Sequence, residues 1–137
     1  MELHAQFSDA EFAARFERCE LPLGSFTHEA HLRLAWIHIA RYGAAQAEAN
    51  IIRLLLQYVK HVGAEDKFHQ TVTVAAVRIV ARCMAQSGTK QFDALLQEFP
   101  ALKTDFNGLL QQHYSFDVFE SERARTAYLP PDLLTLE

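Results

Sequence analysis

The feature that most constrains the fold of this chain is a helical period of apolar residues, which recurs between residues that start or stop helices. Each apolar stretch keeps the i, i+3, i+4 spacing of an amphipathic helix, and a glycine, a proline or a capping residue separates it from the next. The pattern therefore predicts an all-α protein. The expected helices are 9–20, 28–42, 45–62, 67–87, 90–98 and 101–113, followed by a last helical segment through Tyr128.

Capping residues set the expected helix boundaries. Ser8 opens a Ser-x-x-Glu capping box, Thr27 can cap the second helix, and Asp66 can cap the fourth. Gly43 and Gly63 end the second and third helices, because glycine readily adopts the left-handed backbone found at helix C-termini. Short connections between helices favour antiparallel neighbours, so we expect an up-and-down bundle.

Length and hydrophobic content point to one domain spanning residues 1–137. The chain has a common domain size, and 50% of its residues are hydrophobic, which is enough for one sizeable core. Pro130 and Pro131 cannot continue a helix, so we expect an extended C-terminal arm whose Leu133 and Leu134 lie on the body of the protein. The complete prediction is a single-domain antiparallel helical bundle of about six to seven helices with this arm.

Charge and hydropathy exclude several classes of function. Thirteen Lys and Arg against seventeen Asp and Glu give a net charge of -4 with no basic block, so we expect no nucleic-acid partner. No apolar run approaches the roughly 18 residues of a membrane span, and a signal-peptide pattern is missing, so we expect no membrane partner and a cytoplasmic location. Cys19 and Cys83 lack CxxC spacing, and we expect both to be small buried hydrophobic residues.

An unusual set of histidines occupies the second helix. On a helical projection, the residues of interest fall on two opposite sides. One side carries Glu29, Arg33, Ile37 and Ala40, and the other carries His28, His31, Ala35, His38 and Tyr42. Because the charged side is expected to face water, the histidine side should face the bundle interior or a cleft in it.

Three histidines are expected to converge at one end of the bundle. His28 and His31 are three residues apart, so they are neighbours on one helix surface. His69 lies in the first turn of the fourth helix, and helices that run up, down and up bring the second and fourth N-termini to the same end. The last helix can bring Arg125 to that end as well. We therefore predict a pocket formed by His28, His31 and His69, with Arg125 beside it.

The other histidines have ordinary explanations. A single inward-facing histidine is more often a hydrogen-bonded core residue than a ligand, and this interpretation suits His38. We expect His4, His61 and His113 to lie on the surface.

Large apolar residues on the solvent side of the second helix predict a contact with a second copy of the chain. Trp36 and Ile37 fall toward this side, and such residues can mark a homodimer surface. Packing against a neighbouring helix explains the same two residues equally well.

Three blocks of sequence resemble a group of small bacterial helical proteins of unassigned function. Residues 26–36, FTHEAHLRLAW, are similar to that group's Phe-x-His-x-x-His-Leu-x-x-Ala-Trp pattern. Residues 67–73, KFHQTVT, are similar to its Lys-Tyr-His-x-Thr-x-Thr segment. The third block contains Tyr114, Ser115, Ser121, Ala124, Arg125 and residues 131–133. The resemblance implies that the three predicted histidines belong to a shared site together with Arg125.

The chain departs from that group at two positions. Phe68 stands in the place of a tyrosine, and Gln70 stands where the pattern has a glutamate. Gln70 removes a charge that could serve as a metal ligand or a base, so the resemblance supplies no catalytic residue.

Three classes of function fit these residues. The first, which we favour over the other two, is a protein that binds a small polar or anionic molecule in the histidine-lined pocket, because helix N-termini and Arg125 favour negative charge. In the second, His28, His31 and His69 hold Zn²⁺ or Fe²⁺ with open positions for hydrolytic or oxygen chemistry, although the HExxH motif is absent. In the third, a structural or interaction protein uses the polar face as an internal hydrogen-bond network or a subunit interface.

Overall fold

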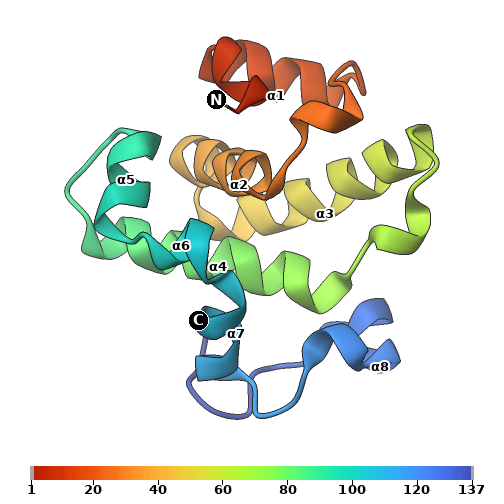
Figure 1. The fold of residues 1–137 in the computed structure, drawn as a ribbon, viewed down its shortest axis with the longest axis vertical. Coiled ribbons are helices and arrows are strands. Elements are labelled where there is room, and N and C mark those ends of the chain that lie inside the picture. Colours follow the sequence, from red (N-terminus) through yellow and green to blue (C-terminus); the bar gives the residue numbers. More distant parts are fainter. Residues whose placement is uncertain (1, 137) are drawn as a thin grey trace. The chain divides into compact units, whose positions relative to one another are not determined.

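The structure, a computed structural model, describes residues 2–136 and contains helices but no strand within that range. Helix accounts for 71% of the described residues, which confirms the all-α prediction. The α-helices, labelled in Figure 1, are α1 Asp9–Glu17, α2 His28–Tyr42, α3 Ala44–His61, α4 Gln70–Gln86, α5 Phe92–Glu98, α6 Ala101–Thr104, α7 Phe106–His113 and α8 Glu122–Thr126. The short 3-10 helices are η1 Leu3–Gln6, η2 Leu23–Ser25, η3 Glu65–Lys67 and η4 Val118–Glu120.

Contacts within the chain are concentrated in two compact units, Met1–Phe68 and His69–Glu137. The first contains α1 to α3, and the second contains α4 to α8. The positions of the units relative to one another are not determined. The antiparallel bundle and the single domain over residues 1–137 therefore stay predictions. Residues 2–136 contain eight α-helices, rather than about six to seven.

An aromatic cluster forms the core of the first unit. α2 and α3 pack against one another, and α1 packs on both. The rings of Phe16, Phe26 and Tyr58 have centroids 4.8 to 5.0 Å apart, distances typical of favourable aromatic contacts. The buried Tyr58 hydroxyl donates a hydrogen bond of 2.9 Å to the carbonyl oxygen of Leu21. The cluster thus holds Phe26, and with it the segment that leads into α2.

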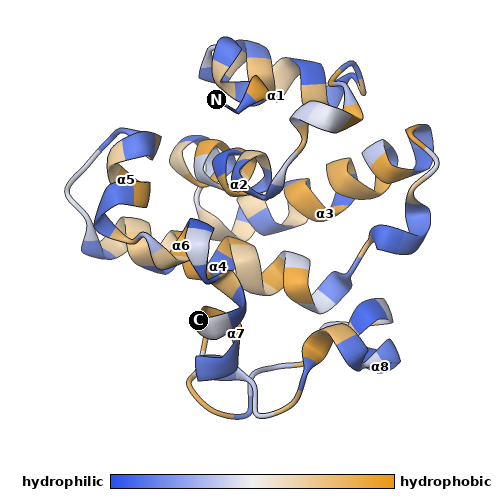
Figure 2. Cartoon of the chain, viewed as in Figure 1, coloured by the Kyte–Doolittle hydropathy of each residue, from blue (hydrophilic) through white to orange (hydrophobic). Residues whose placement is uncertain are grey.

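The second unit is organised around α4. α8 and η4 pack on α4, while α5 contacts α6 and α6 contacts α7. Its buried apolar residues include Val77, Val80, Leu95, Leu102 and Leu110. Figure 2 shows hydrophobic residues recurring along α3 and α4, whereas α8 is mostly hydrophilic. Within residues 2–136, every helix is too short or too polar to cross a membrane.

The start of α4 differs from the sequence prediction. His69, rather than Asp66, is the N-cap residue, because its Nδ1 accepts the N–H of Val72 at 3.1 Å. Asp66 lies in the preceding 3-10 helix. A histidine ring can therefore replace the short polar side chains that usually cap helices.

The helix expected over 101–113 is divided at Asp105. The backbone of Asp105 leaves the helical region at φ -151° and ψ 55°, and its carboxylate accepts the N–H of Gly108 at 3.1 Å. The division produces α6 and α7. A local side-chain hydrogen bond thus interrupts an apolar period that would otherwise continue.

The C-terminal arm is held by its backbone rather than by the leucines predicted to hold it. Leu133 and Leu134 are 53% and 57% exposed, and Leu136 is buried instead. The carbonyl oxygen of His113 accepts the N–H of Leu133 at 3.0 Å, and the ring N–H of His113 donates to Leu134 at 2.8 Å. Arg78 donates to the carbonyl oxygen of Leu136 at 3.0 Å. His113 is buried, so its expected surface position was wrong.

Both cysteines are free and half-buried, not fully buried as predicted. Cys19 follows α1 with a φ of 57°, a left-handed conformation that is uncommon for a residue other than glycine. Burial raises the pKa of the Cys83 thiol. Neither cysteine is therefore a simple core residue.

Candidate functional site

Five residues of α2 are exposed in the opposite sense to the sequence prediction, whereas Ala35 and His38 are buried and Ala40 is exposed as expected. Arg33 and Ile37, expected in water, are only 8% and 2% exposed. His28 and His31, expected to face the interior, are exposed, and so is Tyr42. The prediction was wrong because it assumed that a charged side chain needs water. The guanidinium of Arg33 finds its hydrogen-bond partners inside the protein.

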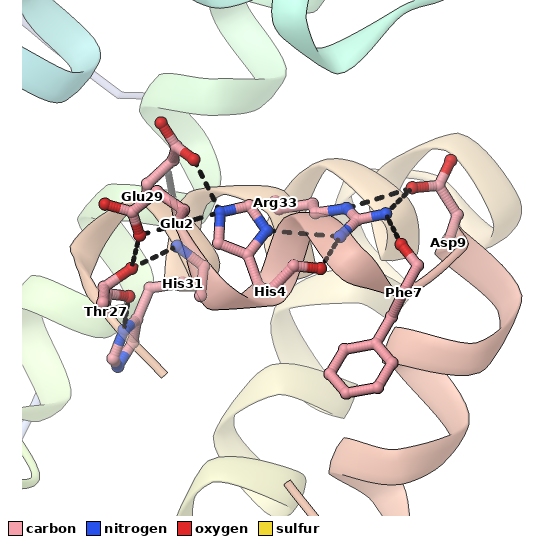
Figure 3. A network of polar contacts seen from close by, with 9 residues as sticks. Glu2, His4, Phe7, Asp9, Thr27, Glu29, His31 and Arg33 are labelled. Carbon is pink, nitrogen blue, oxygen red and sulfur yellow. Dashed lines mark hydrogen bonds and ion pairs between the residues drawn. The ribbon is translucent and has the colours of Figure 1, made fainter. Parts of the chain in front are cut away.

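Arg33 is the centre of a polar network that joins α2 to the N-terminal segment, as Figure 3 shows. Its guanidinium donates to the carbonyl oxygens of His4 at 2.7 Å and Phe7 at 2.8 Å. Its Nη2 also lies 2.8 Å from Oδ1 of Asp9, and its Cζ lies 4.9 Å from the centroid of the Phe12 ring. Within residues 2–136, no buried side-chain nitrogen or oxygen lacks a hydrogen bond. The charge is therefore buried with its donors satisfied.

His4 connects Arg33 to a carboxylate. Arginine cannot accept a hydrogen bond, so Nδ1 of His4, 3.2 Å from Arg33 Nη1, must be the acceptor, and the ring proton sits on Nε2. That N–H donates to Glu29 Oε2 at 2.6 Å. Glu2 lies alongside, with Oε1 3.8 Å from His4 Nε2, and accepts a hydrogen bond from the Thr27 hydroxyl. His4 is 3% exposed, so its expected surface position was wrong.

Glu2, His4 and Glu29 have the composition of a metal site, because one ligand atom of each lies within 4.8 Å of the others. The tautomer of His4 argues against this use. A metal needs the lone pair of Nε2, but the hydrogen bond from Arg33 places the proton on that nitrogen. We therefore interpret the group as the link that holds η1 on α2. The roles of Glu2 and His4 could not be predicted from the sequence, because their partners lie 25 or more residues away.

The imidazole of His31 is held in one orientation at the first turn of α2. Its Nδ1–H donates to the carbonyl oxygen of Thr27 at 2.8 Å, and its ring stacks on Phe26 with centroids 3.8 Å apart. The lone pair of Nε2 is consequently the one that remains for a ligand. Protein packed around the ring lowers the pKa of His31, although part of the side chain reaches solvent. The bond to Thr27 opposes this shift, and His28 adds to it.

His28 lies one turn before His31 on the same helix and is also exposed. Residues three apart on a helix are surface neighbours. After burial, a positive charge on His28 is a further cause that lowers the pKa of His31. The structure therefore places these two predicted site residues on one exposed surface of the first unit.

His69 uses both ring nitrogens within the second unit. Its Nδ1 accepts the N–H of Val72 at 3.1 Å, and its Nε2–H donates to the carbonyl oxygen of Val118 at 2.7 Å. The ring of Phe119 packs against it, with centroids 5.8 Å apart. His69 is buried, and in this arrangement neither nitrogen has a lone pair to give a metal.

Arg125 lies in α8 and is half-buried, with Nε 4.0 Å from the exposed carboxylate of Glu122. The four predicted site residues are thus divided between the units, with His28 and His31 in the first and His69 and Arg125 in the second. Their convergence in one pocket stays a prediction.

His38 is a core residue, as expected. It is 7% exposed, and the side-chain nitrogen of Asn50 lies 3.4 Å from its Nδ1. Burial is the largest cause that lowers the pKa of His38, and the charges of Arg41 and Arg53 act in the same direction. The charge of Glu17 acts in the opposite direction.

The burial of Trp36 and Ile37 also bears on the predicted homodimer. Trp36 and Ile37 are 9% and 2% exposed, so they do not form the solvent-facing pair on which the homodimer rested. The homodimer stays a prediction without that support. His61 is exposed, as expected.

The chain has no match among protein-family models, curated proteins or solved structures, so the candidate sites are judged by their own geometry.

Proposed function

We propose that the chain binds a divalent transition-metal ion, with Zn²⁺ as the first choice, through His28 and His31. The observation that supports this proposal is the hydrogen bond of 2.8 Å from His31 Nδ1–H to the carbonyl oxygen of Thr27. Histidines that ligate metals almost always donate their second ring nitrogen in this way, because the bond fixes the tautomer and the orientation of the ligand. An incoming ion would therefore meet an oriented nitrogen lone pair.

Electrostatics favour the same ligand. The lowered pKa of His31 keeps its ring neutral at neutral pH, so a metal ion has no proton to displace from Nε2. His28 lies one turn earlier on the same exposed surface of the helix, so it is the second candidate ligand. The partial positive charge at the start of α2 opposes a cation by only about 0.3 to 1 kcal/mol, which is small beside the energy of ligand bonds. Two protein ligands leave other coordination positions to water or to a substrate.

A small neutral polar molecule is the second candidate, and the same nitrogen favours it. A hydroxyl or N–H group of such a compound can donate to Nε2 of His31. An anion fits less well than the sequence suggested, because the only proton of the neutral ring is already donated to Thr27.

Isothermal titration calorimetry with Zn²⁺ at neutral pH tests the proposal. We expect saturable binding of about one ion per chain, weakened at least about tenfold in His31→Ala and in His28→Ala. His61→Ala is the matched control, because it removes an exposed histidine from α3 of the same unit and should leave binding unchanged. Absence of binding, or binding that persists in the His28→Ala/His31→Ala double variant, would reject the proposal.

The His69→Ala variant separates a two-histidine site from the predicted three-histidine site. Both ring nitrogens of His69 are bonded to backbone groups, so we expect its removal to leave the affinity for Zn²⁺ unchanged. A loss comparable to that of His31→Ala would add His69 to the site and restore the prediction from sequence.

A further inference from the structure

A cavity of about 290 Å³ lies in the second unit, at one face of α7, whose place in the fold Figure 1 gives. One wall carries Asn107, Leu110, Gln111 and Tyr114, which occupy the i, i+3, i+4 and i+7 positions of a single helical face. Residues 115–118, which follow the end of the helix, form the other wall. The volume lies near the lower end of the range of about 300 to 1,000 Å³ that is typical of small-molecule pockets. A compound of fragment size therefore suits it.

The lining of the cavity carries no positive charge. Lysine, arginine and histidine are missing among its residues, and Asp117 supplies a carboxylate. Burial is the main cause of a strong rise in the pKa of Tyr114, so its phenol stays neutral. A negatively charged ligand would meet repulsion and no ion-pair partner, whereas a group with N–H donors would be attracted.

Two hydroxyl groups of the lining are already used by the C-terminal arm. The hydroxyl of Tyr114 donates to the carbonyl oxygen of Leu129 at 2.8 Å. The hydroxyl of Ser115 donates to the carboxylate of Asp132, and the Ser115 N–H donates to the same residue at 2.9 Å. These bonds fix the walls and leave recognition to other groups.

The carboxamides of Asn107 and Gln111 and the carboxylate of Asp117 are the polar groups that remain for a ligand. The two carboxamides lie one helical turn apart on the exposed side of α7, and each offers both donors and an acceptor. Oδ1 of Asp117 accepts the N–H of Phe119 at 3.0 Å, which orients the carboxylate. The three groups together match a planar N–H-bearing head group.

The apolar part of the cavity lining suits the flat apolar portion of a ligand. Leu110 and Val118 are buried, and the rings of Tyr114 and Phe116 meet edge to face with centroids 5.6 Å apart. Phe116 is 39% exposed, so its ring lies at the solvent side of the cavity. An exposed aromatic ring beside a hollow provides a surface for stacking.

We propose that this cavity binds a small compound with a flat apolar body and a neutral or cationic N–H head group, of the carboxamide or amidine class. The site is independent of the histidines on α2, and it selects against anions through Asp117.

Three probes of nearly equal shape test the proposal: benzamidine, benzamide and benzoate, which are cationic, neutral and anionic. Each is titrated into the ¹⁵N-labelled protein to millimolar concentration, and amide chemical shifts are followed. We expect saturable shifts centred on residues 107–118 for benzamidine and benzamide, with tighter binding of benzamidine and none of benzoate. Equal binding of benzoate, or no saturable shift in these residues with any probe, would overturn the proposal.

Variants identify the groups that recognise the probes. Asp117→Asn preserves a side-chain oxygen for Phe119 and should abolish the preference for benzamidine over benzamide. Gln111→Ala should weaken both probes about three- to tenfold, the effect of one lost hydrogen bond. Gln112→Ala, an exposed neighbour outside the lining, is the control and should bind like the unmodified chain. A preference that survives Asp117→Asn, or equal weakening in Gln112→Ala, would contradict the assignment.

Discussion

The starts of α2 and α4 are each covered by a segment that is distant in sequence, but the side chains that make the connection have different sources. At α2, both partners contribute side chains: η1 supplies the buried His4, and α2 supplies Glu29 and Arg33, whose guanidinium also donates to the backbone of the covering segment. At α4, the helix itself contributes the connecting side chains. His69 bonds the backbone of η4, and Thr71 bonds the backbone of the segment after α8.

The difference determines what each histidine can do. His69 both donates to and accepts from the backbone, so its ring is a structural link. His31, in the first turn of α2, gives up only one nitrogen, and η1 reaches α2 through other residues. Histidines near the starts of two helices therefore have different chemistry, and their hydrogen-bond partners decide which one can bind a ligand.

The largest expected effect is the loss of the link at α2. Arg33→Met keeps the aliphatic stem but removes the donors to His4, Phe7 and Asp9, so we expect a loss of about 3 to 5 kcal/mol in the free energy of unfolding. Urea denaturation measures it. Arg15→Met is the control, because it breaks an exposed pair with Glu11 and a contact of the guanidinium with the Phe7 ring, and it should cost about 1 kcal/mol or less. Similar costs for the two variants would refute the structural role of the network.

The next effect contrasts the two histidines directly. His69→Ala leaves the N–H of Val72 and the carbonyl oxygen of Val118 without partners, and we expect it to cost about 2 to 4 kcal/mol. His69→Asn can still cap α4 and should recover about 1 kcal/mol. His31→Ala, which removes a partly exposed ring, should cost less than about 1 kcal/mol in the same denaturation experiment. A larger cost for His31→Ala than for His69→Ala would contradict the structural role assigned to His69.

A smaller effect concerns Thr71, whose hydroxyl donates to Ala127 at 2.9 Å and accepts the N–H of Leu129 at 3.0 Å. Thr71→Val preserves the shape and removes both bonds, so we expect a cost of about 1 to 2 kcal/mol and faster hydrogen exchange at Leu129. Thr73→Val is the control, because its hydroxyl bonds only the carbonyl oxygen of His69, one turn earlier. Unchanged exchange at Leu129 in Thr71→Val would show that other contacts hold this segment.

The smallest effect is a dependence on pH. Burial lowers the pKa of His38, so the unfolded chain takes up a proton near pH 6.5 while the folded protein resists it. The unfolded state then binds more protons, and the stability should fall as the pH drops below about 6.5. His38→Gln should reduce this loss of stability by less than about 1 kcal/mol in total. An identical slope in His38→Gln would exclude this residue as a cause.

Local hydrogen bonds explain which parts of the fold could be predicted from the sequence. The boundaries of α2 agree with the expected 28–42. The predicted caps Ser8 and Thr27 are confirmed, since each accepts the backbone N–H of the residue three positions later. Such bonds join neighbours in the chain, so they can be recognised from spacing alone.

Distant partners explain what could not be predicted. The burial of Arg33 depends on residues 24 to 29 positions earlier, and the tautomer of His69 depends on Val118, 49 positions later. The helical projection of α2 contained neither contact, so it assigned the charged side to solvent. The unused nitrogen of His31 depends on the rotation of its ring, which residue spacing does not determine.

The link between η1 and α2 also sets an order of events during synthesis. His4 is made 29 residues before Arg33, so at about 5 to 20 residues per second it precedes its partner by about 1.5 to 6 s. During that interval the carbonyl oxygens later bound by Arg33 are hydrated, and η1 has too few residues to persist as a helix. η1 therefore leaves the ribosome before α2 but becomes fixed only after Arg33 has been made.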